Sequence, residues 1–145
     1  MSHTVVIESV DITSKSALKS AVRELIQQHG VKGELKENAK PKFPPGYGLG
    51  YDGSVCDYVL ALADYQMDIG FKKVGRKYQP IIDNMMNYAP LRGKSKSRND
   101  DGRVGKLLQM YAKHAAIEAA ELDGHTVTDA YEDEEGNLKL KFAVA

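Results

Sequence analysis

The chain has 145 residues, a length typical of one domain, and 42% of them are hydrophobic, which is enough for a single core. Lys plus Arg and Asp plus Glu each number 20, and this zero net charge argues against a generally basic nucleic-acid-binding protein but leaves a local basic patch open. Cys56 is the only cysteine, which excludes an intrachain disulfide. No apolar run approaches the ~20 residues of a membrane span, and the first residues lack the pattern of a secretory signal. We therefore expect a cytoplasmic protein.

The first third of the chain predicts a strand, an amphipathic helix and a second strand. Residues 4–10 are rich in β-branched side chains, and residues 16–29 place their apolar positions on one helix face. Gly30 follows, where a left-handed C-terminal cap is expected. Residues 31–36 predict the second strand. Residues 37–54 then combine three prolines with four glycines, which excludes a helix and predicts a flexible loop.

Three strands are expected in the middle of the chain, over residues 55–62, 67–74 and 77–82. Residues 67–74 alternate apolar and polar side chains, and a tight turn at Gly75, which tolerates positive φ, joins them to residues 77–82, which return antiparallel. Pro80 cannot donate a backbone hydrogen bond, so its strand is expected at a sheet edge or to end there. We expect the rest of the chain to pack around this small sheet.

The last third begins with a second flexible loop, expected at residues 89–102. An alanine-rich amphipathic helix then runs to Leu122 and ends at Gly124. Residues 125–131 and 137–144 predict a closing hairpin. The order β-α-β-β-β-β-α-β-β is typical of a single α+β domain with two layers, in which two amphipathic helices cover one face of a mostly antiparallel sheet.

Histidines and carboxylates, the residue types that can serve in catalysis or metal binding, are scattered along the chain. None of the four histidines has a second His or a Cys at the spacing of a metal site. His29 and His114 are interpreted as structural residues of the two helices. Asp57, Asp64 and Asp68 are interpreted as the solvent face of their strands. No catalytic residue, metal or cofactor is predicted, and no nucleophile motif is present in the sequence.

Basic residues gather at the tip of the central hairpin and in the second loop. The candidate residues for binding a protein partner or phosphates are Lys72, Lys73, Arg76, Lys77, Arg92, Lys94, Lys96 and Arg98. If these two groups lie on one side of the molecule, they form a positive patch that could contact nucleic-acid phosphates or an acidic partner.

The glycines of the first loop suggest a candidate site for a small ligand or nucleotide. Its residues are Gly46, Tyr47, Gly48, Gly50 and Tyr51. A phosphate-binding loop needs a strand before it and a helix directly after it, whereas here prolines precede it and a predicted strand follows. A partly aromatic surface loop is the alternative interpretation.

Four motifs follow one another in an order that matches a known family. They are Met1-Ser2-His3, the helix Ala17-Leu18-Lys19-Ser20-Ala21, the central Met67-Asp68-Ile69-Gly70-Phe71 with Gly75 and Tyr78, and Gln109-Met110-Tyr111-Ala112 with Gly124 and Glu135-Gly136-Asn137-Leu138-Lys139-Leu140. On these motifs the chain resembles the plastid and cyanobacterial family known as hypothetical chloroplast reading frame thirty-five, a domain of unknown function numbered twelve-fifty-seven. Both loops look longer than the family pattern, which indicates a divergent member. The resemblance implies occurrence in cyanobacteria, plastids, other bacteria and their phages, and an association with AAA-type ATPases. It implies no biochemical activity.

Three functions are consistent with these patterns. The leading hypothesis is a non-catalytic binding or adaptor protein that acts on a protein partner, such as an AAA-type ATPase or a host regulatory protein. The alternatives are nucleic-acid binding through the basic hairpin tip and basic loop, and small-ligand or nucleotide binding at the glycine-rich loop. Exposed strand edges would also allow a homodimer.

Overall fold

The computed structural model describes residues 2–7 (backbone only), 11–43, 53–82, 91, 104–135 and 137–143. Its elements are β1 (Ser2–Ile7), α1 (Lys15–Gln28), β2 (Gly33–Ala39), β3 (Cys56–Leu62), β4 (Ile69–Val74), β5 (Lys77–Ile81), α2 (Gly105–Leu122), β6 (Thr126–Glu132) and β7 (Leu138–Ala143). The predicted order and the α+β class are confirmed. None of the helices in these described ranges is long and apolar enough to cross a membrane.

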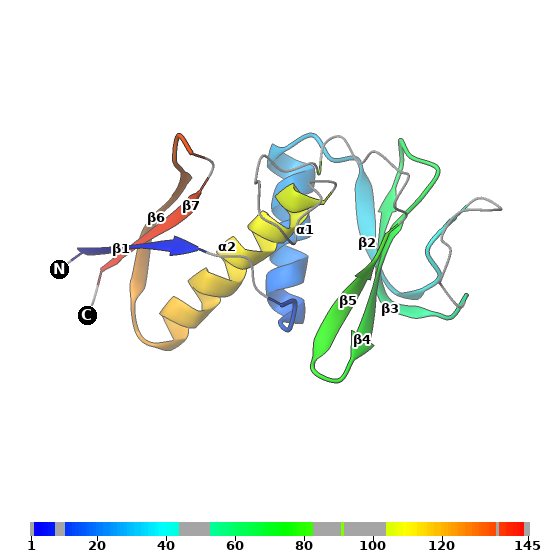
Figure 1. Cartoon of the computed structure of the whole chain (residues 1–145), viewed down its shortest axis with the longest axis horizontal. Coiled ribbons are helices and arrows are strands. Elements are labelled where there is room, and N and C mark those ends of the chain that lie inside the picture. Colours follow the sequence, from blue (N-terminus) through cyan, green and yellow to red (C-terminus); the bar gives the residue numbers. More distant parts are fainter. Residues whose placement is uncertain are drawn as a thin grey trace.

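The strands divide into two antiparallel sheets. One has the order β2-β3-β4-β5 and the other the order β1-β7-β6. Figure 1 shows the two helices between the sheets, with α1 beside the four-stranded sheet and α2 running toward the three-stranded sheet. The expectation of one sheet carrying both helices on one face is therefore corrected. Each sheet has its own helix, and the two helices pack against each other.

The main core lies between α1, the start of α2 and the four-stranded sheet. Its fully buried side chains include Leu18 and Leu25 from α1, Leu60 and Phe71 from the sheet, and Leu107 from α2. The helix pair is therefore central. The β4–β5 hairpin, which we expected at the middle of the fold, forms one edge of the four-stranded sheet (Figure 1).

Most local predictions hold at the level of single residues. Gly30, Gly75 and Gly124 all have positive φ, as the two helix ends and the hairpin turn require. Pro80 lies on β5, which is an edge strand of its sheet. Strand β2 continues to Ala39, three residues beyond its predicted end.

Candidate functional site

An open trough of about 680 Å³ lies on the outer face of the four-stranded sheet. It is lined by Gly33, Glu34, Lys36, Lys40, Lys42, Ala61, Leu62, Ala63 and Asp68. Glu34 is paired with Ala61, and Lys36 with Val59. These positions alternate with Leu35 and Leu60, whose side chains belong to the core beneath α1. Because side chains alternate between the two faces of a strand, the trough lies on the face turned away from α1.

The chain that follows β2 forms one wall of this trough. In Figure 1 it leaves the end of β2 and passes on the side of the sheet away from α1. Pro41 is buried there. A Cβ atom built on Gly70 would lie 3.3 Å from Cγ of Pro41 and 3.0 Å from Sγ of Cys56. The absence of a side chain at Gly70 thus gives this segment room to lie close on the sheet.

Asp68 fastens the same segment to the sheet. Its Oδ2 atom accepts a hydrogen bond from the backbone nitrogen of Lys42 at 2.8 Å, and its Oδ1 atom accepts one from Leu62 at 3.2 Å. The Asp68 nitrogen in turn donates to the Lys42 carbonyl at 3.0 Å. Asp68 is only 6% exposed, so its interpretation as a solvent-face residue is corrected. Backbone N–H groups satisfy both oxygens and make its burial tolerable.

Three lysines give the trough a positive character. Lys36, Lys40 and Lys42 are exposed along it, and the carboxylates that line it are Glu34 and the buried Asp68. The Nζ atom of Lys36 lies 3.7 Å from Oε1 of Glu34, but both side chains are at least half exposed. An ion pair in such a setting is weak because solvent screens it. The ammonium groups therefore stay available to an incoming anion.

At the predicted hairpin tip, Lys72 and Lys73 each contact a neighbouring side chain. Lys72 donates a hydrogen bond from Nζ to Oγ of Ser54. Lys73 has its Nζ atom 5.9 Å from the ring centre of Tyr78, a cation–π arrangement. The Lys72 contact reaches Ser54, which precedes β3, and the Lys73 contact lies within the hairpin.

The end of the hairpin is also fastened to the start of α1. Lys77 forms an ion pair with Asp11 at 2.9 Å, and the Tyr78 nitrogen donates to the Ile12 carbonyl at 2.7 Å. Arg76 is exposed in the turn. The turn and the trough lie at opposite ends of β4, so the structure does not bring them together.

The other predicted site residues fall outside the described part of the chain. These are Arg92, Lys94, Lys96 and Arg98 of the basic loop, and Gly46, Tyr47, Gly48, Gly50 and Tyr51 of the candidate ligand loop.

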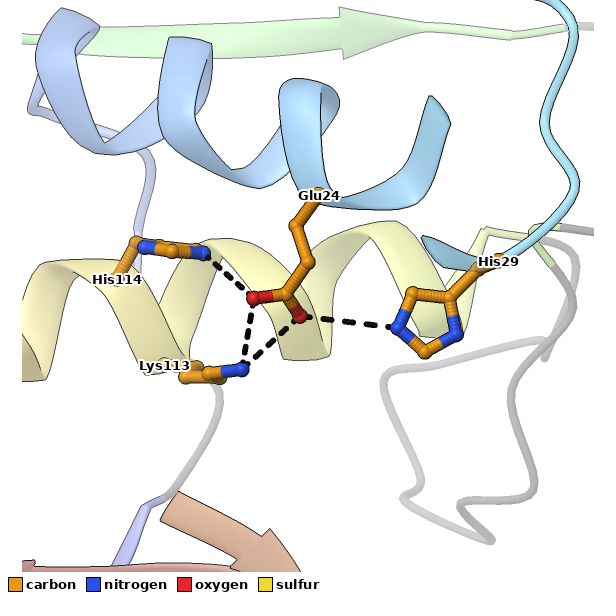
Figure 2. Close-up of polar contacts among 4 residues, drawn as sticks. All are labelled: Glu24, His29, Lys113 and His114. Atoms are coloured by element: carbon orange, nitrogen blue, oxygen red, sulfur yellow. Dashed lines mark hydrogen bonds and ion pairs between the residues drawn. The ribbon is translucent and has the colours of Figure 1, made fainter. Parts of the chain in front are cut away.

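A second polar cluster lies at the contact of the two helices, and the sequence patterns did not predict it. Glu24 of α1 accepts hydrogen bonds from Nζ of Lys113 at 2.8 and 2.9 Å, and Nε2 of His114 lies 3.3 Å away. Nε2 of His29 approaches the same carboxylate at 3.7 Å. Figure 2 shows the three basic side chains converging on Glu24. Their exposed fractions are low, with 21% for Glu24 and 18% for Lys113.

Burial and charge act in opposite directions within this cluster. Burial alone raises the pKa of Glu24, but the hydrogen bonds and charges of Lys113 and His114 outweigh it and hold that pKa below its ordinary value. For His114, burial lowers the pKa and the nearby Lys113 adds to this, against the opposing pull of Glu24. Glu24 is thus ionised and His114 neutral at pH 7. A carboxylate held in this way is a poor general base.

The opposite end of the helix contact is joined through Glu118. Its Oε2 atom accepts a hydrogen bond from the hydroxyl of Ser14 at 2.9 Å, and its Oε1 atom accepts one from Ser16 at 2.6 Å. The Ser14 hydroxyl oxygen also accepts from the backbone nitrogen of Ala17 and caps α1. Among the described residues, no group of three or more His, Cys, Asp or Glu side chains is placed to hold a metal ion.

Comparison with known proteins adds one finding. The family model described as "Protein of unknown function (DUF1257)" matches residues 34–141, about three quarters of the chain. The chain belongs to this family. The DUF1257 range contains the central and late motifs noted in the sequence, whereas Met1-Ser2-His3 and the α1 motif precede it. Neither the curated proteins nor the solved structures give a match.

The DUF1257 range also contains every residue that lines the trough except Gly33. Sequence reasoning missed this site because its walls come together only when residues 40–42 fold back over the sheet. One available signal was β3 itself. Its residues Cys56–Leu62 are mostly apolar without alternation, which is typical of a strand buried on both faces.

Proposed function

We propose that the protein is a non-catalytic binding protein that acts on a protein partner, which it holds at the lysine-lined trough. The single observation that carries this proposal is a positively charged trough with a fixed wall. Pro41 is seated over Gly70, and Asp68 binds the Lys42 backbone from both its side chain and its own nitrogen. A surface ordered before the partner arrives loses less conformational entropy on binding.

The assignment as non-catalytic rests on how the reactive groups of the helix contact are used. Glu24 is occupied by Lys113, and Glu118 accepts from two serine hydroxyls. Tyr111, buried at 1% exposure, accepts hydrogen bonds from backbone groups. Each of these side chains stabilises the fold where an enzyme would leave a group free to meet substrate.

An AAA-type ATPase and a host regulatory protein are the partners to test first, because the family resemblance suggests the former and the adaptor hypothesis includes both. We place the interaction in the cytoplasm of a plastid-related, cyanobacterial or phage-infected cell, the settings that the resemblance implies. Cys56, the only cysteine, is fully buried, which suits a reducing compartment.

The test is site-specific photo-cross-linking of the full chain in its natural host. A photoreactive amino acid at position 34 should capture a protein partner that mass spectrometry can identify, and the same amino acid at position 132 on β6 serves as the control. Adding Lys36→Glu, Lys40→Glu and Lys42→Glu together should abolish capture. The matched control replaces three exposed cations outside the trough, Lys15, Arg23 and Lys141, with Glu. This variant should still capture the partner. Capture that is equal at both positions, or equal in both triple variants, would refute the proposal.

Nucleic-acid binding through the hairpin tip and the basic loop stays the alternative. Because Lys72 and Lys73 already contact Ser54 and the Tyr78 ring within the chain, the protein proposal is preferred. A gel shift at low salt separates the two functions. Retardation that weakens steeply with added salt and is lost on Arg76→Glu would favour the alternative.

A further inference from the structure

We infer that the trough takes an extended, acidic segment of the partner, with carboxylates on alternate residues. This inference rests on the proposed function and specifies the class of ligand that the trough recognises. It follows from the width of the trough, from its floor and from the placement of its charges.

The width of the trough suits one extended chain. One wall is the outer face of β2, at Glu34 and Lys36, and the other is the segment around Pro41, which lies over Gly70 of β4. Strand β3 lies between β2 and β4. Neighbouring strands are about 4.8 Å apart, so the backbones of β2 and β4 are roughly 10 Å apart from centre to centre, and the free width between the walls is smaller than this. A helix with its side chains is about 10–12 Å across and would not enter, whereas a single extended chain would.

The floor of the trough leaves room for a backbone to approach closely. Its side chains at Ala61 and Ala63 are single methyl groups, and Gly33 has none. Gly33 cannot carry a side chain, because a Cβ atom there would lie 2.2 Å from the carbonyl oxygen of Ala61. The trough is also open along its length. A small anion would stay largely in water there, whereas binding sites for small molecules cover most of the ligand.

Lysines line both walls of the trough. Lys40 and Lys42 flank the buried Pro41, and Lys36 stands on the opposite wall. In an extended segment, every second side chain points to the same side, at intervals of about 6.6–6.8 Å. The flexible lysine stems can reach such positions while their heads stay hydrated. The oxygens of Asp68 accept hydrogen bonds from the backbone nitrogens of Lys42 and Leu62, and the lining holds three lysines against two carboxylates, Glu34 and Asp68.

Selection from a random dodecapeptide library displayed on phage tests this inference with the full chain immobilised. We expect the enriched peptides to carry Asp or Glu at alternate positions and to lack a helical pattern. A labelled copy of the strongest binder should lose at least tenfold in affinity, by fluorescence anisotropy, toward the variant with Lys36→Glu, Lys40→Glu and Lys42→Glu. The control variant, in which Lys15, Arg23 and Lys141 are replaced by Glu, should bind the peptide with the same affinity as the natural chain.

A charge-swapped peptide, with Lys in place of each acidic residue, provides a rescue. It should bind the trough variant and fail to bind the natural chain. Enriched peptides without alternating acids, or no enrichment at all, would overturn the inference of an acidic extended ligand. The proposed function would survive that result if photo-cross-linking at position 34 still captures a partner. If the selected peptides bind both triple variants equally and no partner is captured at position 34, the inference and the proposed function both fail.

Discussion

The phenol oxygen of Tyr111 on α2 lies 3.0 Å from the backbone nitrogen of Ser14, the capping residue of α1, and accepts its hydrogen bond. The same oxygen accepts a second bond, at 2.8 Å, from the backbone nitrogen of Thr13. A helix leaves the N–H groups of its first turn without partners inside the helix. Here a side chain of the second helix supplies the acceptor at the N-cap, so the start of α1 depends on the docking of α2.

Replacing Tyr111 with Phe should therefore destabilise the protein without opening a cavity. The ring remains, but two backbone donors lose their acceptor, and we expect a loss of about 1–3 kcal/mol in the free energy of unfolding. Urea denaturation followed by circular dichroism measures this loss. Tyr131→Phe on β6 is the matched control, with an expected change within about 0.5 kcal/mol. An equal effect of both substitutions would contradict the role given to the Tyr111 hydroxyl.

The Glu24 cluster predicts a difference between two ion pairs of α1. Glu24→Gln leaves the ammonium of Lys113, which is mostly buried, without its counter-charge. The expected loss of unfolding free energy is about 1–3 kcal/mol, between the values for exposed and fully buried pairs. Glu37→Gln breaks the exposed pair of Glu37 with Lys19, and we expect no measurable loss there because solvent already screens that pair. Denaturant midpoints for the two variants, measured side by side, provide the comparison.

The lowered pKa of His114 predicts a dependence of stability on pH. Burial depresses this pKa below the ordinary value of 6.5 in the folded state only, so the unfolded chain binds the proton at higher pH than the native chain does. Stability should then be greatest above pH 6.5 and fall as the pH drops from there to the folded pKa. Glu24 and Glu118 oppose this shift, and Lys113 reinforces it.

His114→Gln should flatten the pH dependence in that window, as measured by urea denaturation at several pH values between 5 and 8. Glu24 acts in a different window. Its lowered pKa contributes stability that is present above pH 4.5 and is lost as the pH falls through its folded pKa. A His114→Gln variant that keeps the full slope between pH 5 and 6.5 would show that another group is responsible.

Asp68 predicts a link between the stability of the fold and the shape of the trough. In Asp68→Asn the side chain keeps one oxygen, so one of the N–H groups of Lys42 and Leu62 loses its acceptor and meets an amide donor instead. We expect a loss of about 2 kcal/mol in unfolding free energy and faster hydrogen exchange at the Lys42 amide. Asp64→Asn, at an exposed neighbouring position, should change neither quantity.

The sequence patterns predicted the nine elements but not their division into two sheets. Alternation in β7, where Leu138 and Leu140 are buried between lysines, shows that one face of the strand is covered. It does not show which helix covers it. Strand β7 takes β1 as a neighbour, and that pairing depends on contacts between the two ends of the chain, which no local pattern reports.

The candidate site was less predictable for a related reason. Alternation correctly placed Met67 and Ile69 in the interior but suggested that Asp68 meets solvent. The segment at Pro41 covers that part of the outer face, so the same alternation leads to a buried carboxylate. The Glu24 cluster likewise needs the axial register of α1 against α2, because Glu24 and Lys113 are far apart in the sequence.

The pairing of the first strand with the last has a consequence for the order of folding. The β2-β3-β4-β5 meander joins strands that are neighbours in the chain, and loop closure within it is short for β3, β4 and β5. Strand β1 has no neighbour until β7 is available, nearly the whole length of the chain later. During synthesis, the meander and α1 can assemble while β1 is still unpaired. We therefore expect the three-stranded sheet to form last and to be the first part to open under mild denaturant.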